Sequence, residues 1–200
     1  MHIIGLGTTA QVGKDTTAAY LEERYPLDGP GPFFVKRVAF ADKLKEITMS
    51  LFELSYEQCY GDKDVKEAVD PRYGKSPRQI LQEVGERMRS IINPHIWVDT
   101  VFSNVIPELA AQGYNTFVIS DVRYPNEADK VHAAGGGVVK ITRPGSGTSV
   151  GASHASETSM NSYEGFDFHI DNDGSLNYLY SQADALMEVI NDRETGWDVD

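Results

Sequence analysis

The feature that most constrains this chain is its first seventeen residues, which read as an apolar strand, a loop of small residues and a helix opening on Gly-Lys-x-Thr. The strand covers residues 3–7 and the helix begins near Lys14. Backbone N–H groups of such a loop converge on an anion, the helix N-terminus adds its dipole, and the lysine reaches the outer phosphates. The layout predicts a phosphate-binding loop.

The loop and the first helical turn supply the expected phosphate contacts. Gly13 is expected to let the backbone approach the phosphate, because a Cβ there would intrude. A threonine hydroxyl in the first turn can reach a phosphate or a metal-bound water. The predicted ATP-binding residues are Ala10, Gln11, Val12, Gly13, Lys14, Asp15, Thr16 and Thr17.

This motif departs from its usual spacing at two positions. Thr8 stands five positions before Gly13, where a glycine is usual, and Asp15 replaces the Ser or Thr that normally follows the lysine. The alternative to phosphate binding is an ordinary strand-to-helix turn with a chance Gly-Lys pair.

Length and charge narrow the class of protein. The 200 residues fit one domain with room for an insertion, and 18 basic against 30 acidic side chains give a net charge of -12. Such a surface repels polyanions over most of its area, which argues against nucleic acid as a partner. A small phosphorylated ligand in a local basic pocket is compatible with this charge.

Cysteine content and hydropathy indicate the compartment. The single cysteine, Cys59, excludes an internal disulfide and a cysteine-cluster metal site, and a buried or idle thiol is its expected role. We find no apolar run of membrane-spanning length and no signal peptide. We therefore expect a cytoplasmic protein with no membrane partner.

Strands and helices alternate along the chain. Candidate strands begin near residues 2, 33, 115, 137 and 167, and helices are expected over 14–25, 41–54, 77–92, 95–112, 125–134 and from 176 onward. The closing helix is expected to bury Leu176, Leu179, Ala183, Leu186 and Ile190. This alternation predicts a parallel sheet covered on both faces, with the third strand beside the first.

Two segments show weak periodicity. Residues 55–76 are charged and predicted to form a long loop, which is either a substrate loop or a solvated excursion. A small-residue loop over 145–151 leads to His154, which has no histidine or cysteine partner at metal-ligand spacing. A structural role is the better prediction for His154.

The helix over 77–92 carries an apolar stripe made of Ile80, Leu81, Val84, Met88, Ile91 and Ile92. Arg78 and Gln79 fall in its first turn, where an arginine runs against the helix dipole and so suggests a bound anion. The alternative is that Arg78 ties down the preceding loop through Asp70 or a carbonyl.

For three further residues the sequence allows either a ligand-binding role or a structural role. Asp42 opens the second helix and can cap it or orient a ligand group. Trp97 lies near the start of the helix predicted over 95–112, and a tryptophan there is more often a core residue than a platform for a ligand. Asp121 ends a buried-type strand, where a carboxylate can hold a metal-bound water beside a phosphate loop.

Eight blocks spread along the chain carry a family resemblance. Among them, Gly-Lys-Asp-Thr at 13–16 and Asp-Val-Arg-Tyr-Pro-Asn-Glu at 121–127 are specific together. The other blocks lie at 40–45, 77–82, 96–99, 143–144, 154–157 and 170–176. On these residues the chain resembles the bacteriophage-type deoxynucleoside monophosphate kinases, over nearly its whole length. Gly7-Thr8 and the bulky Val12 depart from that family's pattern.

The resemblance implies an α/β fold of three layers, P-loop kinase-like, with a five-stranded, mainly parallel sheet. It implies a single domain over 1–200, with a substrate-binding helical region at about 41–112 and a lid-like loop at about 143–160. The implied reaction moves the ATP γ-phosphoryl group to a deoxynucleoside monophosphate (dNMP) with Mg²⁺.

Roles follow from the resemblance at matching positions. Lys14 would bridge the β- and γ-phosphates, Thr16 and Asp121 would hold Mg²⁺, and Asp15 would orient the acceptor phosphate or a metal-bound water. Arg123 and Arg143 would stabilise the moving phosphoryl group, which makes Lys14, Asp15, Arg123 and Arg143 the implied catalytic set. The acceptor would lie between the second strand and helix 77–92, touching Asp42, Lys45, Arg78, Gln79 and Trp97.

Three alternatives remain open: another P-loop small-molecule kinase, for example one similar to dephospho-CoA kinase; a non-catalytic nucleotide-binding module; and an interaction protein with an accidental loop. A homodimer is one open oligomeric state. A phage-encoded protein would work in the host cytoplasm.

Overall fold

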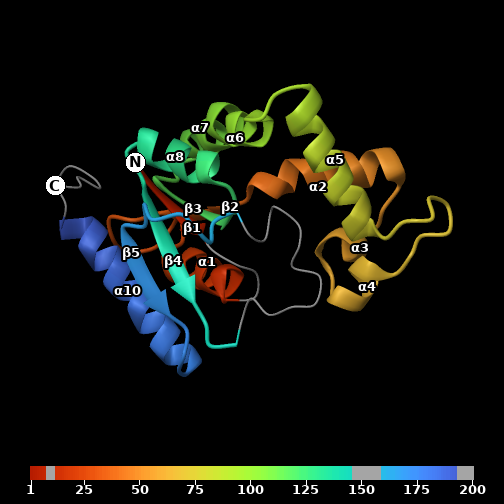
Figure 1. Ribbon diagram of the computed structural model, residues 1–200. Helices are drawn as coiled ribbons and strands as arrows, with labels where there is room; N and C mark the ends of the chain where they lie inside the picture. Colours follow the sequence, from red (N-terminus) through yellow and green to blue (C-terminus); the bar gives the residue numbers. More distant parts are fainter. Residues whose placement is uncertain (8–11, 146–158, 193–200) are drawn as a thin grey trace. The chain divides into compact units, whose positions relative to one another are not determined.

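A five-stranded parallel sheet forms the centre of the computed structural model, which describes residues 1–7, 12–145 and 159–192. The strands are β1 (His2–Gly7), β2 (Val35–Val38), β3 (Thr116–Val122), β4 (Gly137–Thr142) and β5 (Phe168–Asp171), in the order β2-β3-β1-β4-β5 (Figure 1). Every pairing is parallel, and β3 lies beside β1 as predicted.

The chain divides into two compact units. The first comprises residues 1–39 and 104–200 and contains the sheet; the second comprises residues 40–103 and is helical. The second unit covers most of the region predicted to bind substrate.

Helices cover both faces of the sheet in the first unit. Helices α1 (Lys14–Arg24) and α10 (Leu176–Asp192) share a buried core with β1 on one face, where Leu6 and Leu186 are fully buried. Helix α8 (Pro125–Ala133) packs on the other face, where a Cβ on Gly5 would lie 3.2 Å from Val131. The three-layer α/β prediction is confirmed.

One residue of the closing helix was predicted wrongly. Leu176 is 52% exposed, whereas the other four predicted inner-face residues are buried. Leu176 is the first residue of α10 and projects before the helix reaches the sheet core.

Short helices replace the long loop predicted over 55–76. The second unit contains α2 (Phe40–Phe52), α3 (Tyr56–Tyr60), α4 (Lys63–Glu67), α5 (Pro77–Ile91) and α6 (Ile96–Thr100). Ser55 and Gln58 form a capping box at the start of α3, which satisfies N–H groups that a five-residue helix would otherwise leave exposed. The sequence periodicity was too short to reveal these elements.

The apolar stripe on α5 is shorter than predicted. Ile80 is buried, and Gly85 packs against Leu44 of α2, with 3.0 Å between a built Cβ and Leu44 Cδ2. Ile91 and Ile92 are 71% and 66% exposed, so their assignment to the stripe was wrong. Ile91 is the last residue of α5 and Ile92 is its C-cap.

The predicted helix over 95–112 is a run of three segments. After α6 the chain widens into a π-helix, η1 (Val101–Val105), and continues as α7 (Ile106–Ala111).

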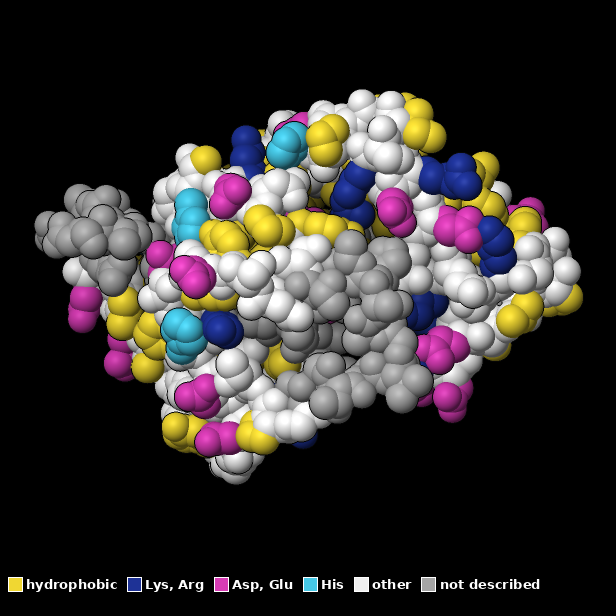
Figure 2. All heavy atoms as spheres, in the orientation of Figure 1, with side chains coloured by type: hydrophobic (Ala, Val, Ile, Leu, Met, Phe, Trp, Pro, Cys, Tyr) yellow, Lys and Arg dark blue, Asp and Glu magenta, His cyan; other side chains and the backbone are white. Residues whose placement is uncertain are grey.

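Among the described residues, no helix combines the length and the hydropathy needed to cross a bilayer. On the face drawn in Figure 2, the acidic and basic side chains of the described residues are interspersed.

Candidate functional site

Gly13 sets the turn from the loop into α1. Its φ of 107° lies in the left-handed region that favours glycine, and a Cβ there would lie 2.7 Å from Asn172 Nδ2. Asn172 Nδ2 donates a hydrogen bond to the Val12 carbonyl at 2.9 Å. Backbone conformation and the Asn172 contact therefore both require glycine here, and Asn172 is a supporting residue that the sequence did not reveal.

The first turn of α1 directs backbone N–H groups out of the helix. The first hydrogen bond within the helix runs from Thr17 N to Gly13 O at 2.9 Å. The backbone N–H groups of Lys14, Asp15 and Thr16 come before it and have no acceptor within the helix. No side chain caps this helix among the described residues. A helix N-terminus of this kind favours an anion.

The predicted ATP-binding residues differ in their exposure to solvent. Thr16 is exposed, whereas Thr17 is fully buried and its Oγ1 donates to the Gly13 carbonyl at 3.0 Å. The Thr17 hydroxyl thus bonds back to the preceding turn, as threonines inside helices often do, and its contact with a ligand stays a prediction. Val12 is buried, and Ala10 and Gln11 lie outside the described residues.

Lys14 is a buried cation. Only 7% of the residue is exposed, and the pKa of its ammonium group is lowered from 10.5 to about 8, mainly by burial. The positive charge of Arg123 contributes to this lowering, while the carboxylates of Asp121, Asp15 and Glu127 oppose it. The predicted residues Lys14, Asp121 and Arg123 are thus close enough to feel one another's charge.

Glu127 holds the chain that carries Arg123. Its Oε2 accepts hydrogen bonds from the backbone N–H of Arg123 at 2.7 Å and of Tyr124 at 3.1 Å, and the residue is only 2% exposed. No role was predicted for Glu127 from the sequence. Its place at the third position of a helix that begins with Pro125 was the available signal.

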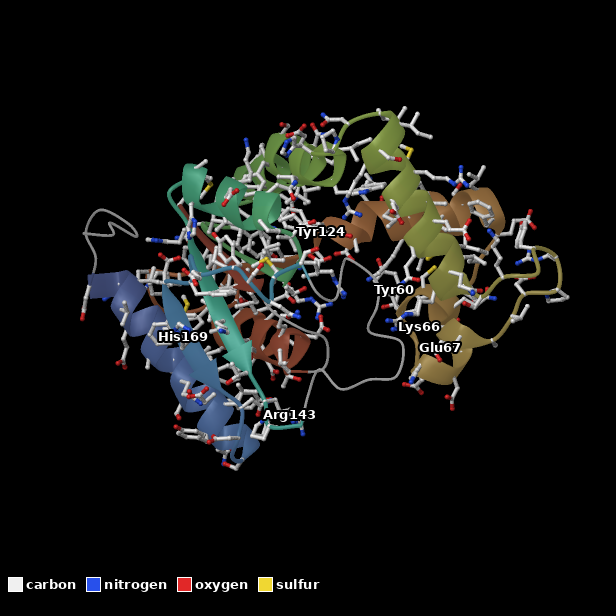
Figure 3. All side chains as sticks on the ribbon, viewed as in Figure 1. Tyr60, Lys66, Glu67, Tyr124, Arg143 and His169 are labelled. Carbon is white, nitrogen blue, oxygen red and sulfur yellow. The ribbon has the colours of Figure 1, made fainter. Side chains whose placement is uncertain are left out.

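The carboxyl ends of β1, β3 and β4 meet at one edge of the sheet. Gly7 is in register with Val122 of β3 and with Lys140 of β4. Asp121 and Arg123 therefore lie at this edge, and the exposed Arg143 follows the end of β4 (Figure 3). In open parallel sheets ligands bind at this edge.

Arg37 is a second residue that the sequence did not reveal. It belongs to β2, and its Nη1 lies 4.0 Å from Asp15 Oδ1. The Asp15 side chain is 85% exposed and that of Arg37 is 38% exposed. Because the pair depends on the order of strands in the sheet, no local pattern indicated it.

Two predicted acceptor residues of the second unit contact each other. Lys45 Nζ lies 3.6 Å from Asp42 Oδ1, and Tyr60 Oη donates to the same oxygen at 3.2 Å. Arg78 Nη1 lies 3.9 Å from Glu67 Oε1. Arg72 Nη2 lies 2.7 Å from Asp70 Oδ2, and the alternative that Arg78 ties down the preceding loop through Asp70 or a carbonyl stays a prediction.

The other two predicted acceptor residues have structural roles. Gln79 Oε1 accepts from the Ser76 N–H at 2.9 Å, and Ser76 Oγ accepts from the Gln79 N–H at 3.3 Å, which forms a capping box at the start of α5. Trp97 is 4% exposed, and its Nε1 donates to the Gly85 carbonyl at 3.2 Å. Trp97 is a core residue, so we leave it out of the proposed site.

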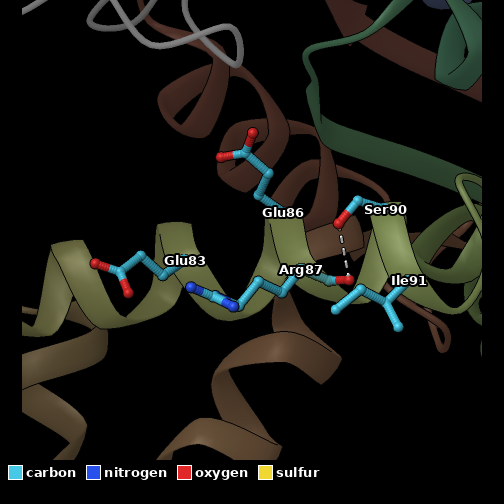
Figure 4. Close-up of a pocket in the computed structure, with 5 residues that line it drawn as sticks. All are labelled: Glu83, Glu86, Arg87, Ser90 and Ile91. Carbon is cyan, nitrogen blue, oxygen red and sulfur yellow. Dashed lines mark hydrogen bonds between the residues drawn. The ribbon is translucent and has the colours of Figure 1, made fainter.

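A surface groove on α5 contains none of these residues. Glu83, Glu86, Arg87, Ser90 and Ile91 line it, all from successive turns of one helix (Figure 4). Ser90 Oγ donates to the Arg87 carbonyl at 3.2 Å. The groove therefore does not compete with the residues around Lys14 as the candidate site.

His154 and most of the lid-like loop predicted at about 143–160 lie outside the described residues.

Comparisons with known proteins identify relatives. A protein of Acanthamoeba polyphaga mimivirus, provisionally named a deoxynucleotide monophosphate kinase, is 34% identical over 94% of this chain and 97% of its own length. The deoxynucleotide monophosphate kinase of Escherichia phage RB69 is 28% identical over 56% of this chain and 45% of its own.

A solved structure and a family model complete the comparison. Dephospho-CoA kinase from Campylobacter jejuni aligns over 94% of this chain and 96% of its own with a TM-score of 0.49 and 16% identity, which is too low to bear on function. The family model for deoxynucleotide monophosphate kinase matches residues 44–183. With that match and the mimivirus relative, this chain belongs to the deoxynucleotide monophosphate kinase family.

Proposed function

We propose that this protein transfers the γ-phosphoryl group of ATP to a dNMP, giving ADP and the deoxynucleoside diphosphate. Family membership supports the reaction class. The observation that carries the proposal is the buried Lys14 at the start of α1, with Asp121 and Arg123 within electrostatic reach. A desolvated cation at a helix N-terminus favours binding of a polyphosphate.

The donor end of the reaction belongs to the first unit. In this proposal the N–H groups of the first turn of α1 bind the β-phosphate, and Lys14 bridges the β- and γ-phosphates. With a pKa of about 8, Lys14 is mostly protonated at neutral pH, and a bound phosphate raises that pKa further. Burial strengthens its attraction for the phosphates, because water does not screen it.

The residues at this site fit Mg²⁺ bound together with ATP. Among the described residues, no cluster of three or more His, Cys, Asp or Glu forms a metal cage. Mg²⁺ in phosphoryl-transfer sites takes one or two carboxylates and completes its shell with phosphate and water oxygens. The Asp121 carboxylate and the Thr16 hydroxyl are oxygen donors of this kind and would hold it, and the ion would neutralise phosphate charge.

Arginine side chains would stabilise the phosphoryl group in transit. Glu127 holds the backbone of Arg123 at the sheet edge, and Arg143 follows β4 at the same edge. Arg37 and Asp15 add an ion pair beside the phosphate loop, in which Arg37 offsets the cost of a carboxylate near phosphates. Phosphoryl transfer needs positioning and charge neutralisation more than covalent chemistry.

The acceptor would be bound by Asp42, Lys45 and Arg78 of the second unit. Asp42 and Lys45 form a contact pair on α2, and Arg78 lies in the first turn of α5. No general base is required, because a phosphate monoester oxygen is already ionised at neutral pH.

Three broader features complete the proposal. The chain would act as one catalytic domain, with the second unit as its acceptor-binding insertion. Its reaction would take place in the cytoplasm, that of the host if the gene is viral, because both nucleotides are found there. Nucleic acid would not be a partner at a net charge of -12. A homodimer is compatible with this scheme.

An acceptor panel tests the proposal. Each dNMP, the matching ribonucleotide and dephospho-CoA are incubated with ATP and Mg²⁺, and ADP and the phosphorylated product are quantified. We expect turnover with at least one dNMP and none with dephospho-CoA. Nucleotide binding without turnover of any acceptor would support a non-catalytic module instead, and absence of nucleotide binding would overturn the phosphate site itself.

A further inference from the structure

A tyrosine with no role in the scheme above organises the acceptor residues of the second unit. Tyr60 Oη donates to Asp42 Oδ1 at 3.2 Å, and Lys45 Nζ lies 4.1 Å from the centre of the Tyr60 ring. Tyr56 stacks on the same ring with 4.6 Å between ring centres and an interplanar angle of 16°. The hydroxyl and the ring of Tyr60 are thus both engaged, so Tyr60 is suited to hold other groups rather than to stack on a base.

The contacts of Tyr60 converge on one ion pair. Lys45 Nζ and Asp42 Oδ1 are 3.6 Å apart, with side-chain exposures of 23% and 43%. A pair of exposed charges on long side chains normally samples many geometries. Here the Tyr60 hydroxyl fixes the carboxylate and its ring face attracts the ammonium group, so one arrangement is favoured before any ligand binds.

The charge of this pair indicates which part of a nucleotide it suits. Lys45 and Asp42 together carry no net charge, and a phosphate that approached Lys45 would meet the Asp42 carboxylate. An uncharged group that both donates and accepts hydrogen bonds, such as the deoxyribose hydroxyl or the edge of a base, suits the pair better. Lys14 differs, because its burial leaves it a net attraction for phosphate.

The Tyr60 hydroxyl stays a donor over the working range of pH. Burial raises the pKa of Tyr60 well above its usual value of 10, and the Asp42 carboxylate raises it further. Glu46 of α2 raises the pKa of Tyr60 as well, and Lys43 Nζ lies 2.5 Å from Glu46 Oε2. The charges of Lys43 and Glu46 cancel, so these two residues add no net charge to the surroundings of the pair.

We propose that Tyr60 is a positioning residue of the acceptor site, which fixes Asp42 and Lys45 so that the pair binds the nucleoside part of the dNMP and not its phosphate. This inference rests on the proposed function and adds to it the part of the substrate that each cluster recognises. The phosphate of the acceptor is then left to the arginines.

The test compares Tyr60→Phe with Tyr56→Phe. Both variants lose one hydroxyl and keep the stacked rings, but only Tyr60→Phe loses the bond to Asp42. We expect Tyr60→Phe to raise the KM for dNMP about tenfold, which corresponds to one hydrogen bond to a charged group, with kcat and the KM for ATP within about twofold of wild type. Tyr56→Phe is expected to match wild type in all three constants.

Inhibition by fragments of the acceptor separates nucleoside from phosphate recognition. Tyr60→Phe should raise the inhibition constant of the matching deoxynucleoside about tenfold and leave that of inorganic phosphate unchanged. Asp42→Asn is a second variant that keeps the acceptor oxygen for Tyr60 but removes the negative charge, so it should make inorganic phosphate a stronger inhibitor. Melting curves identify any variant whose change reflects lost folding.

The outcomes are distinguishable. A wild-type protein that phosphorylates no dNMP overturns the proposed function, and this inference with it. A wild-type enzyme with normal turnover whose Tyr60→Phe variant keeps its KM, or changes inhibition by phosphate and not by the nucleoside, overturns this inference alone. Equal effects of Tyr60→Phe and Tyr56→Phe would likewise show that the bond to Asp42 positions nothing.

Discussion

The two units hold their charged side chains in opposite ways. Lys14 in the first unit is buried, and desolvation lowers its pKa to about 8, so the nucleotide-free protein holds this charge against its own stability. Lys45 in the second unit is partly exposed and already contacts Asp42 and the Tyr60 ring. At Lys14 desolvation outweighs the neighbouring carboxylates, so a bound phosphate adds stabilising charge there, whereas Lys45 is partly exposed to water and has a carboxylate oxygen 3.6 Å away.

The largest expected effect is on turnover at Lys14. Lys14→Met keeps the length of the side chain and removes its charge, and loss of a preorganised cation in a desolvated site costs about 10²-fold or more in rate. Initial rates with ATP, Mg²⁺ and the best dNMP measure it. Lys36→Met is the control, because that lysine also lies in the first unit but pairs with Glu22 at 2.7 Å. A rate for Lys14→Met near that of Lys36→Met would refute the role of Lys14.

The same substitution should stabilise the free protein. Lys14 has a folded pKa of about 8 against 10.5 when unfolded, so below pH 8 the buried charge costs roughly 3 kcal/mol, at 1.36 kcal/mol per pKa unit. Between pH 8 and 10.5 the unfolded state binds more protons than the folded state, and wild-type stability rises with pH. Denaturant unfolding at pH 7 and pH 10.5 should therefore show an advantage of Lys14→Met that shrinks at the higher pH. A less stable variant at pH 7 would contradict this account.

A smaller effect is expected at Asp121. As a partner of Mg²⁺, Asp121→Asn should raise the Mg²⁺ concentration needed for half-maximal rate by roughly 30-fold, within the range seen when metal partners are altered. Nucleotide binding without metal should change little. Titration of the rate with Mg²⁺ checks this, and a Mg²⁺ dependence equal to that of wild type would instead make Asp121 a purely structural carboxylate.

The smallest effect is expected at Arg78, where one cation replaces another. Arg78→Lys keeps the charge but cannot make two parallel bonds to a phosphate, so we expect the KM for dNMP to rise about tenfold while the KM for ATP stays unchanged. Arg87→Lys on the surface groove of the same helix is the control. An equal rise in the KM for dNMP and the KM for ATP would show that Arg78 does not bind the acceptor phosphate.

The first unit was the more predictable from sequence. Its central strands β1 and β3 are short runs of buried, mostly apolar residues, and Gly13-Lys14 indicated the phosphate loop because backbone geometry there is encoded locally. The hydrogen bond from the Thr17 hydroxyl to the Gly13 carbonyl was not foreseen, because sequence spacing does not say whether a hydroxyl turns outward or bonds back to its own helix. Arg37 could not be found, since its distance from Asp15 depends on which strands are neighbours.

The second unit was less predictable, for two physical reasons. Helices α3 and α4 are too short to show an amphipathic period, although the Ser55–Gln58 and Ser76–Gln79 spacings marked two helix starts. Gln79 and Trp97 have side chains that suit a ligand, but the cap and the core use them first. Tyr60 went unnoticed because its role lies in contacts with Lys45 and Asp42 of α2, which lie 15 and 18 residues earlier in the chain.

The most direct test of the account is the pKa of the Lys14 ammonium group itself. An NMR titration of lysine side chains labelled with ¹³C and ¹⁵N, with Lys14 assigned through the Lys14→Met variant, gives this pKa in the free protein and with ADP bound. We expect about 8 in the free protein and a clear rise with ADP, because the phosphates add negative charge beside the ammonium group. A free pKa near 10.5, or one that ADP leaves unchanged, would contradict the claim that this buried lysine is the phosphate-binding cation.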